Sequence, residues 1–297
     1  MRDSDKEAES HSVIDAHHHF IDTKNSCHQF LNSLGASTYL PEDYCKDTNG
    51  LSIFRTIHVE ALPDSGIDEV VWLEKLISEG RAPMIGAIVA QCNLALDNTE
   101  SYLDSLLTVS PSRLRGIRYI LDYDGPYSSS SDGNNSNATH VACSRHNMDY
   151  LRDPTESVKF EKGLSMLQSR GLSFDLQCCP AQLSAAFEIF RRNADIRVCI
   201  NHLGKPRHLL YNNGNKDNSD SKEAEWRYGM RLMATLPNVF VKISMLGYAV
   251  PGGLIHTYIH TYIHTYIHTY IHTSYIKIYL NIYTYINLIF SPRYIHT

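Results

Sequence analysis

Residues 13–20 read Val-Ile-Asp-Ala-His-His-His-Phe, and this stretch indicates how the chain folds. It opens with β-branched residues and closes with histidines, as expected for a buried strand that delivers polar side chains at its end. Because side chains alternate along a strand, His17 and His19 should lie on one side and His18 on the other. Two imidazoles at one strand end can hold a divalent metal ion or polarise a carbonyl group.

Six further apolar stretches follow the first, and amphipathic segments separate most of them. The apolar stretches are Phe54–Ala61, Met84–Cys92, Leu114–Leu121, Leu172–Cys179, Ile196–Leu203 and Val239–Leu246. The segments with helical period are Ile67–Gly80, Thr99–Val109, Ser157–Gly171, Ala181–Asn193 and Glu223–Leu236. This alternation predicts a parallel sheet, and seven strands before the tail favour a (β/α)8 TIM-type barrel that is incomplete, lacking the eighth strand.

The composition excludes several classes of protein. A net charge of −5 argues against a surface that binds nucleic acid. The start of the chain is charged, and no run of about 18 apolar residues occurs, so we expect no membrane partner. The seven cysteines show no zinc-finger spacing and lie mostly in apolar runs. A cytoplasmic protein is therefore expected.

The composition changes abruptly near Gly253. Residues 255–273 repeat Ile-His-Thr-Tyr, which is what the tetranucleotide ATAC encodes when it is read in triplets. We hypothesise that the residues after 253 derive from an intron or from read-through. A metal-binding histidine stripe is the alternative, but Ile, Thr and Tyr favour an aggregation-prone strand. The predicted organisation is a disordered N-terminus (1–11), a truncated barrel domain (12–253) and a low-complexity tail (254–297).

Two polar insertions follow predicted strand ends, at Asp122–Asn137 and Asn212–Ser221. Loops in these places carry the active sites of barrel enzymes, so the insertions are either lids or solvated loops without a function.

A third histidine belongs with the first pair. Residues 198–206 read Val-Cys-Ile-Asn-His-Leu-Gly-Lys-Pro, so that His202 ends an apolar strand that Gly204 and Pro206 stop. In a parallel barrel this strand end faces the same mouth as His17 and His19. The alternative is a histidine that only caps its strand.

Several short motifs occur together in a particular order. They are Asp15–Phe20, His58–Ala61, Gly116–Arg118, Phe174–Leu176, Asn201–Pro206 and Leu236–Ser244. As a set, over residues 12–250, they resemble the amidohydrolase-related family that includes 2-pyrone-4,6-dicarboxylate lactonase and sugar lactonases.

This resemblance implies a hydrolase acting on a small molecule, a lactone or another ring that bears a carboxylate. The catalytic residues it implies are His17, His19 and His202, which would also be the ligands of a divalent metal such as zinc, if one is bound. These residues do not decide whether a metal ion is bound, because some lactonases of this group work without a metal. Arg118 matches an arginine position in related sequences and could pair with a substrate carboxylate or form a structural ion pair. Glu60 and Gln177 lie near strand ends and could line the pocket or orient a histidine.

One expected residue is missing. The resemblance implies an aspartate at the end of the eighth strand as the general base, yet no Asp or Glu follows Gly253. We therefore expect a poorly folded chain with impaired activity. The alternatives are a zinc-dependent, decarboxylase-like lyase and an inactive pseudoenzyme.

Overall fold

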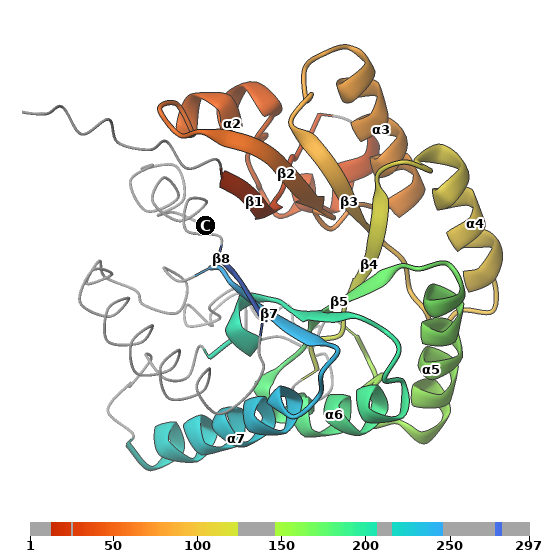
Figure 1. Cartoon of the computed structure of the whole chain (residues 1–297), viewed down its shortest axis with the longest axis vertical. Coiled ribbons are helices and arrows are strands. Elements are labelled where there is room, and N and C mark those ends of the chain that lie inside the picture. The colour runs from red at the N-terminus through yellow and green to blue at the C-terminus, as the bar shows by residue number, and fades with distance from the viewer. Residues whose placement is uncertain (1–12, 25, 124–145, 207–215, 246–276, 281–297) are drawn as a thin grey trace, which may run out of the picture.

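The computed structural model describes residues 13–24, 26–123, 146–206, 216–245 and 277–280. Its centre is a parallel sheet in which each strand pairs with the next one along the chain. The strands are β1 (Val13–His18), β2 (Ile53–Val59), β3 (Ile85–Gln91), β4 (Leu114–Ile120), β5 (Ser173–Gln177), β6 (Val198–Ile200), β7 (Val239–Ile243) and β8 (Lys277–Leu280). Figure 1 shows the sheet curling into a barrel with helices on its outside.

The main helices alternate with the strands, as the sequence predicts. They are α3 (Gly66–Ser78), α4 (Thr99–Val109), α5 (Pro154–Ser169), α6 (Leu183–Arg192) and α7 (Lys216–Ala234). Short helices α1 (Gln29–Ser33) and α2 (Pro41–Asp47) lie between β1 and β2, where the sequence analysis predicts none. No helix in the described part of the chain combines the length and the apolar character needed to cross a bilayer.

Local signals explain where the helices begin. The Ser65 hydroxyl accepts a hydrogen bond from the Asp68 N–H at the start of α3, and the Asp153 carboxylate accepts two from the first turn of α5. Gly66 is required at the start of α3, because a Cβ there would lie 2.2 Å from the carbonyl oxygen of Gln91. The close approach fixes the first turn of α3 against the end of β3.

The core lies between the sheet and the helices. Phe160 of α5, Phe174 of β5 and Phe190 of α6 are fully buried and pack ring against ring. Apolar side chains therefore cover the outer face of the sheet, as in other barrels. The interior is more polar, because Lys242 of β7 donates a hydrogen bond to Asp175 of β5 across it, at 2.5 Å.

The seven predicted strands form a nearly closed parallel barrel, which is consistent with the predicted incomplete TIM barrel, and a four-residue strand, β8, extends the sheet where no strand was predicted. β8 pairs parallel with β7, with Ile243 opposite Leu280, and it also approaches β1. It lies in the segment interpreted as a low-complexity tail. Its Ile and Tyr residues have high strand propensity, and the free edge of β7 offers unpaired backbone groups. The composition of this segment indicates low complexity, but its Ile and Tyr content also favours a strand.

Other predicted segments have different outcomes. The second polar insertion was expected at 212–221, but residues 216–221 belong to α7. Most of the first insertion, the N-terminus (1–11) and the Ile-His-Thr-Tyr repeat lie outside the described residues.

Candidate active site

The described residues bring three histidines together at the carboxyl ends of β1 and β6. The Nε2 atoms of His17 and His19 are 3.2 Å apart, and the ring centroids of His17 and His202 are 4.7 Å apart. His17 and His202 are buried, whereas His19 is partly exposed. We call His17, His19 and His202 the inner cluster. His18 points the other way, to Thr56 Oγ1 at 2.8 Å, as strand alternation requires.

Backbone and hydroxyl groups orient two of these rings. His19 Nδ1 lies 2.7 Å from the Val59 carbonyl oxygen, which can only accept, so Nδ1 carries the proton. His19 Nε2 therefore carries a lone pair and accepts the hydrogen bond from His17 Nε2–H. His202 Nδ1 pairs with Ser244 Oγ, just beyond β7, at 2.7 Å. The cluster thus presents one N–H donor and one imidazole acceptor side by side.

The backbone that carries His202 is strained. His202, Leu203 and Lys205 have φ angles of 53°, 54° and 58°, in the left-handed region that residues with a Cβ avoid. Each such residue costs about 1–3 kcal/mol and persists only where its surroundings hold it. One restraint is Lys205 itself, whose buried ammonium group lies 2.5 Å from the Asp122 carboxylate.

Burial and nearby cations keep the inner cluster neutral. Burial, followed by the positive charge of Arg118, lowers the pKa of His19 to about 3. Burial also lowers the pKa of His17, with a further effect of Lys242, and that of His202, with a further effect of Arg118. All three imidazoles are therefore uncharged near neutral pH and available as donors, acceptors or ligands.

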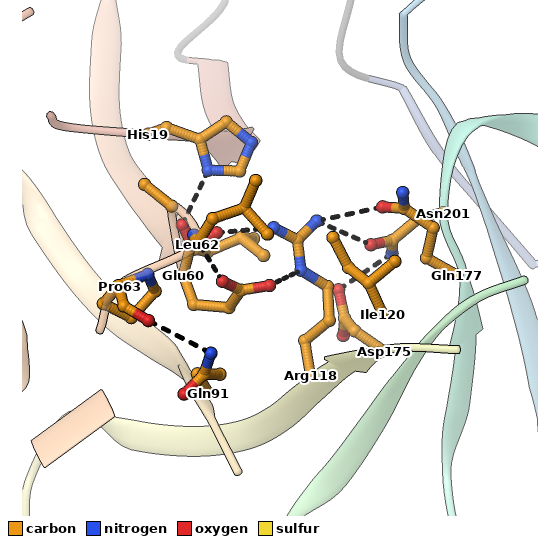
Figure 2. A network of polar contacts seen from close by, with 12 residues as sticks. His19, Glu60, Leu62, Pro63, Gln91, Arg118, Ile120, Asp175, Gln177 and Asn201 are labelled. Atoms are coloured by element: carbon orange, nitrogen blue, oxygen red, sulfur yellow. Dashed lines mark hydrogen bonds and ion pairs between the residues drawn. The ribbon is translucent and has the colours of Figure 1, made fainter. Parts of the chain in front are cut away.

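Arg118 lies beside the cluster, and the sequence-predicted residues Glu60 and Gln177 contact it rather than a histidine. Its Nε donates to Glu60 Oε1 at 2.6 Å, and its Nη2 donates to the Glu60 carbonyl oxygen. Its Nη1 faces the amide oxygens of Gln177 and Asn201 at 3.4 and 3.3 Å (Figure 2). The guanidinium is buried and paired with Glu60. Of the two roles that the sequence allows for Arg118, this geometry matches the structural ion pair rather than the binding of a substrate carboxylate.

Several partners of the site are not predicted from the sequence. Asn201, the residue before His202, donates to Asp175, which also accepts from Lys242. Ser244 and Lys242 belong to a quoted motif, and alternation along β7 would have placed them on the same face. Asp122, the partner of Lys205, lay at the edge of a predicted insertion, where no periodic signal marks it.

The inner cluster alone does not complete a metal site. Two imidazole ligands on one tetrahedral zinc ion are separated by about 3.3 Å, given Zn–N bonds of about 2.0–2.1 Å. The 3.2 Å between His17 and His19 matches that value. However, no three His, Cys, Asp or Glu side chains among the described residues are arranged to hold a metal ion together.

Known proteins are similar to this chain over most of its length. The sequence profile of a family described as Amidohydrolase matches residues 14–267. An uncharacterised protein, y4mH, from Sinorhizobium fredii is 24% identical over 251 residues, which cover 80% of this chain and 73% of that protein.

Solved structures share the fold. An amidohydrolase from Burkholderia multivorans with bound zinc has a TM-score of 0.58 and 21% identity, over 81% of this chain and 72% of its own. A probable 2-pyrone-4,6-dicarboxylic acid hydrolase from Acinetobacter baumannii with citric acid bound has a TM-score of 0.56 and 13% identity. Those matches cover 82% of this chain and 74% of the Acinetobacter chain.

Proposed function

This chain belongs to the amidohydrolase family, and on that premise we propose that it hydrolyses a lactone by water attack at the inner cluster. The observation that carries the proposal is the meeting of three neutral imidazoles beside a buried arginine at the carboxyl end of a parallel barrel. Active sites of this architecture lie at that end. The Acinetobacter baumannii relative, described as a hydrolase of a dicarboxylic acid, supports a substrate ring that bears a carboxylate.

In the proposed reaction the inner cluster moves one proton. Water and substrate first replace the hydrogen bond between His17 and His19, and His19 Nε2 then accepts a proton from water while the water oxygen bonds to the lactone carbonyl carbon. His17 Nε2–H and His202 polarise the carbonyl oxygen, and the charge of Arg118 stabilises the negative charge that develops there. The ring C–O bond then breaks, and the departing oxygen takes the proton from His19. The product is an open-chain hydroxy acid.

Arg118 acts in this proposal mainly through its charge. Glu60 occupies its Nε and Nη2, so a substrate carboxylate could reach only the Nη1 edge, in competition with Gln177 and Asn201. Glu60 and Gln177 then orient the guanidinium rather than bind substrate directly.

Turnover should be slow. A general base works best when its pKa lies near the working pH, whereas the pKa of His19 is about 3. β8 occupies the place of the strand expected to carry the aspartate, but its residues 277–280 are Lys, Ile, Tyr and Leu. Loss of a positioned base costs about 10²- to 10⁴-fold in rate. The proposed activity of this chain is therefore impaired.

No step of this mechanism passes through a metal ion, because the inner cluster offers two converging ligands rather than three. We expect purified protein to hold less than one tightly bound zinc ion per chain. Elemental analysis after dialysis against a chelator measures this. A stoichiometric zinc ion would favour a metal-dependent reaction, including the lyase alternative.

The experiment uses the whole chain and a panel of lactones, with and without a ring carboxylate, and measures the acid released. We expect slow ring opening that His19→Gln abolishes and His18→Gln retains, since His19 is the proposed base and His18 lies on the opposite face of β1. No opening of any lactone, or equal losses in both variants, would refute the proposal. Release of carbon dioxide from a carboxylated substrate would point to a decarboxylase instead.

A further inference from the structure

A second group of buried polar side chains lies behind the inner cluster, on the outer face of β2. It consists of His28, His58 on β2 and Glu69 on α3, and we call it the outer cluster. All three side chains are fully buried. The proposed reaction uses none of them.

Glu69 is the centre of the outer cluster. Its Oε1 accepts a hydrogen bond from the Ala61 N–H at 2.8 Å and lies 3.4 Å from His28 Nε2 and 3.5 Å from His58 Nε2. Burial alone would raise the pKa of Glu69, but the hydrogen bonds from His28, His58 and Ala61 lower it to about 2. Burial would likewise lower the pKa of His28, but its bonds to Cys27 and Glu69 raise it to about 9. Glu69 is therefore a buried carboxylate whose Oε1 faces both imidazoles, and the raised pKa of His28 favours its protonated form.

The Ala61 N–H connects Glu69 to the active site. Ala61 lies in the short segment 59–62 at the end of β2, and this segment makes the contacts that orient two groups of the site. The Val59 carbonyl oxygen accepts from His19 Nδ1, and Glu60 accepts from Arg118 through both its side chain and its carbonyl. Figure 2 shows His19 and Arg118 reaching this segment from different directions.

Segment 59–62 needs an external restraint. Leu62 has a φ angle of 56°, a conformation that residues with a Cβ avoid, and its N–H folds back onto Glu60 Oε2 at 2.6 Å. A strained backbone of this kind persists only where surrounding contacts over-determine it. The Ala61–Glu69 hydrogen bond is such a contact, and α3 holds Glu69 rigidly because Gly66 packs against the Gln91 carbonyl oxygen.

We propose that Glu69 is a positioning residue for the active site, which holds segment 59–62 by the Ala61 N–H and thereby orients His19 and Arg118. The inference rests on the proposed function for its kinetic consequence, but not for its structural one. This role requires an acceptor oxygen at the position that a glutamate side chain reaches, within hydrogen-bond distance of the Ala61 N–H. It does not require a negative charge at that position.

Two conservative variants of Glu69 separate the effect of side-chain length from the effect of the negative charge. Glu69→Gln keeps an oxygen at the same reach without the charge, whereas Glu69→Asp keeps the charge but is one methylene shorter. Glu74→Asp in the same helix is the matched control, because Glu74 contacts Ser110 and Arg113 instead.

The first readout is the ¹⁵N spectrum of the His19 ring, which reports the Nδ1–H tautomer without requiring any activity. We expect Glu69→Gln and Glu74→Asp to keep the wild-type tautomer and Glu69→Asp to give a mixture. The second readout is lactone hydrolysis, where Glu69→Asp should lower kcat by about 10- to 100-fold, as for other residues that orient a functional group, with KM nearly unchanged.

A wild-type His19 spectrum in folded Glu69→Asp would overturn the proposal, as would loss of the tautomer in Glu69→Gln. If the wild-type chain opens no lactone, the proposed function fails while the ¹⁵N measurement still tests the role of Glu69. Circular dichroism establishes that each variant is folded before either readout is taken.

Discussion

The inner and outer clusters both contain buried histidines, but the pKa values of the inner histidines and of His28 shift in opposite directions. In the inner cluster the imidazoles face one another and cations, and burial lowers the pKa of each. In the outer cluster a carboxylate stands between two imidazoles, and the pKa of His28 rises to about 9 although its side chain is fully buried. Burial thus does not decide the charge of a histidine when a carboxylate accepts its hydrogen bond.

The largest effect on stability should come from the outer cluster. His28→Leu would leave Glu69 as a buried anion without its cationic partner, and breaking such a pair costs about 3–5 kcal/mol. Urea unfolding monitored by circular dichroism measures the free energy of unfolding. A loss below about 1 kcal/mol would show that His28 and Glu69 are not an ion pair.

A smaller loss of stability is expected in the inner cluster, where no ion pair is broken. His202→Leu leaves the Ser244 hydroxyl without its imidazole partner, and an unsatisfied buried polar group costs about 1–3 kcal/mol. The same variant should lose all lactone hydrolysis. If His202→Leu destabilises the protein as much as His28→Leu, or retains turnover, the contrast between the two clusters is wrong.

The pH dependence of stability should have opposite signs for the two clusters. His19 has a folded pKa of about 3, below its unfolded value of 6.5, so its contribution is complete above pH 6.5 and is lost as pH falls toward 3. His28 has a folded pKa of about 9, so its contribution is complete below pH 6.5 and is lost as pH rises through 9. Each effect amounts to about 1.4 kcal/mol per pH unit.

Urea unfolding over a series of pH values separates these contributions. His19→Asn should reduce the slope between pH 6.5 and 4.5, where His17 and His202 also contribute and below which carboxylates of the unfolded chain, Glu69 included, begin to take up protons. His28→Asn should flatten the slope between pH 6.5 and 9. Identical pH profiles for the two variants would remove the distinction between the clusters.

Most of the barrel could be predicted from local patterns. The predicted strand Leu114–Leu121 corresponds to β4, and the predicted helix Thr99–Val109 has the bounds of α4. β8 was not predicted, because its four residues follow a repeat that we interpreted as low-complexity sequence, and because a strand this short depends on a neighbouring edge. Pairing with β7 is a long-range interaction, and residues 277–280 are too few to show a periodic pattern that would predict it.

The two clusters differ in the same way. His17 and His19 could be identified because alternation along one strand is local, and His202 because strand ends of a parallel barrel share a mouth. Glu69 falls within a predicted helix and looks like any acidic residue of its first turns. Its burial arises only when α3 packs on the sheet and brings it to His28, a residue 41 positions away.

The amino-acid sequence by itself determined the succession of strands and helices and the side of β1 on which each histidine lies. Both follow from the local periodicity of side chains along a strand or a helix. Only the tertiary structure decided that Arg118 pairs with Glu60, that β8 pairs with β7, and in which direction the pKa values of His19 and His28 shift. These outcomes depend on distances between groups far apart in the chain. In a medium of low dielectric constant, a partner a few ångströms away outweighs any property of the residue alone.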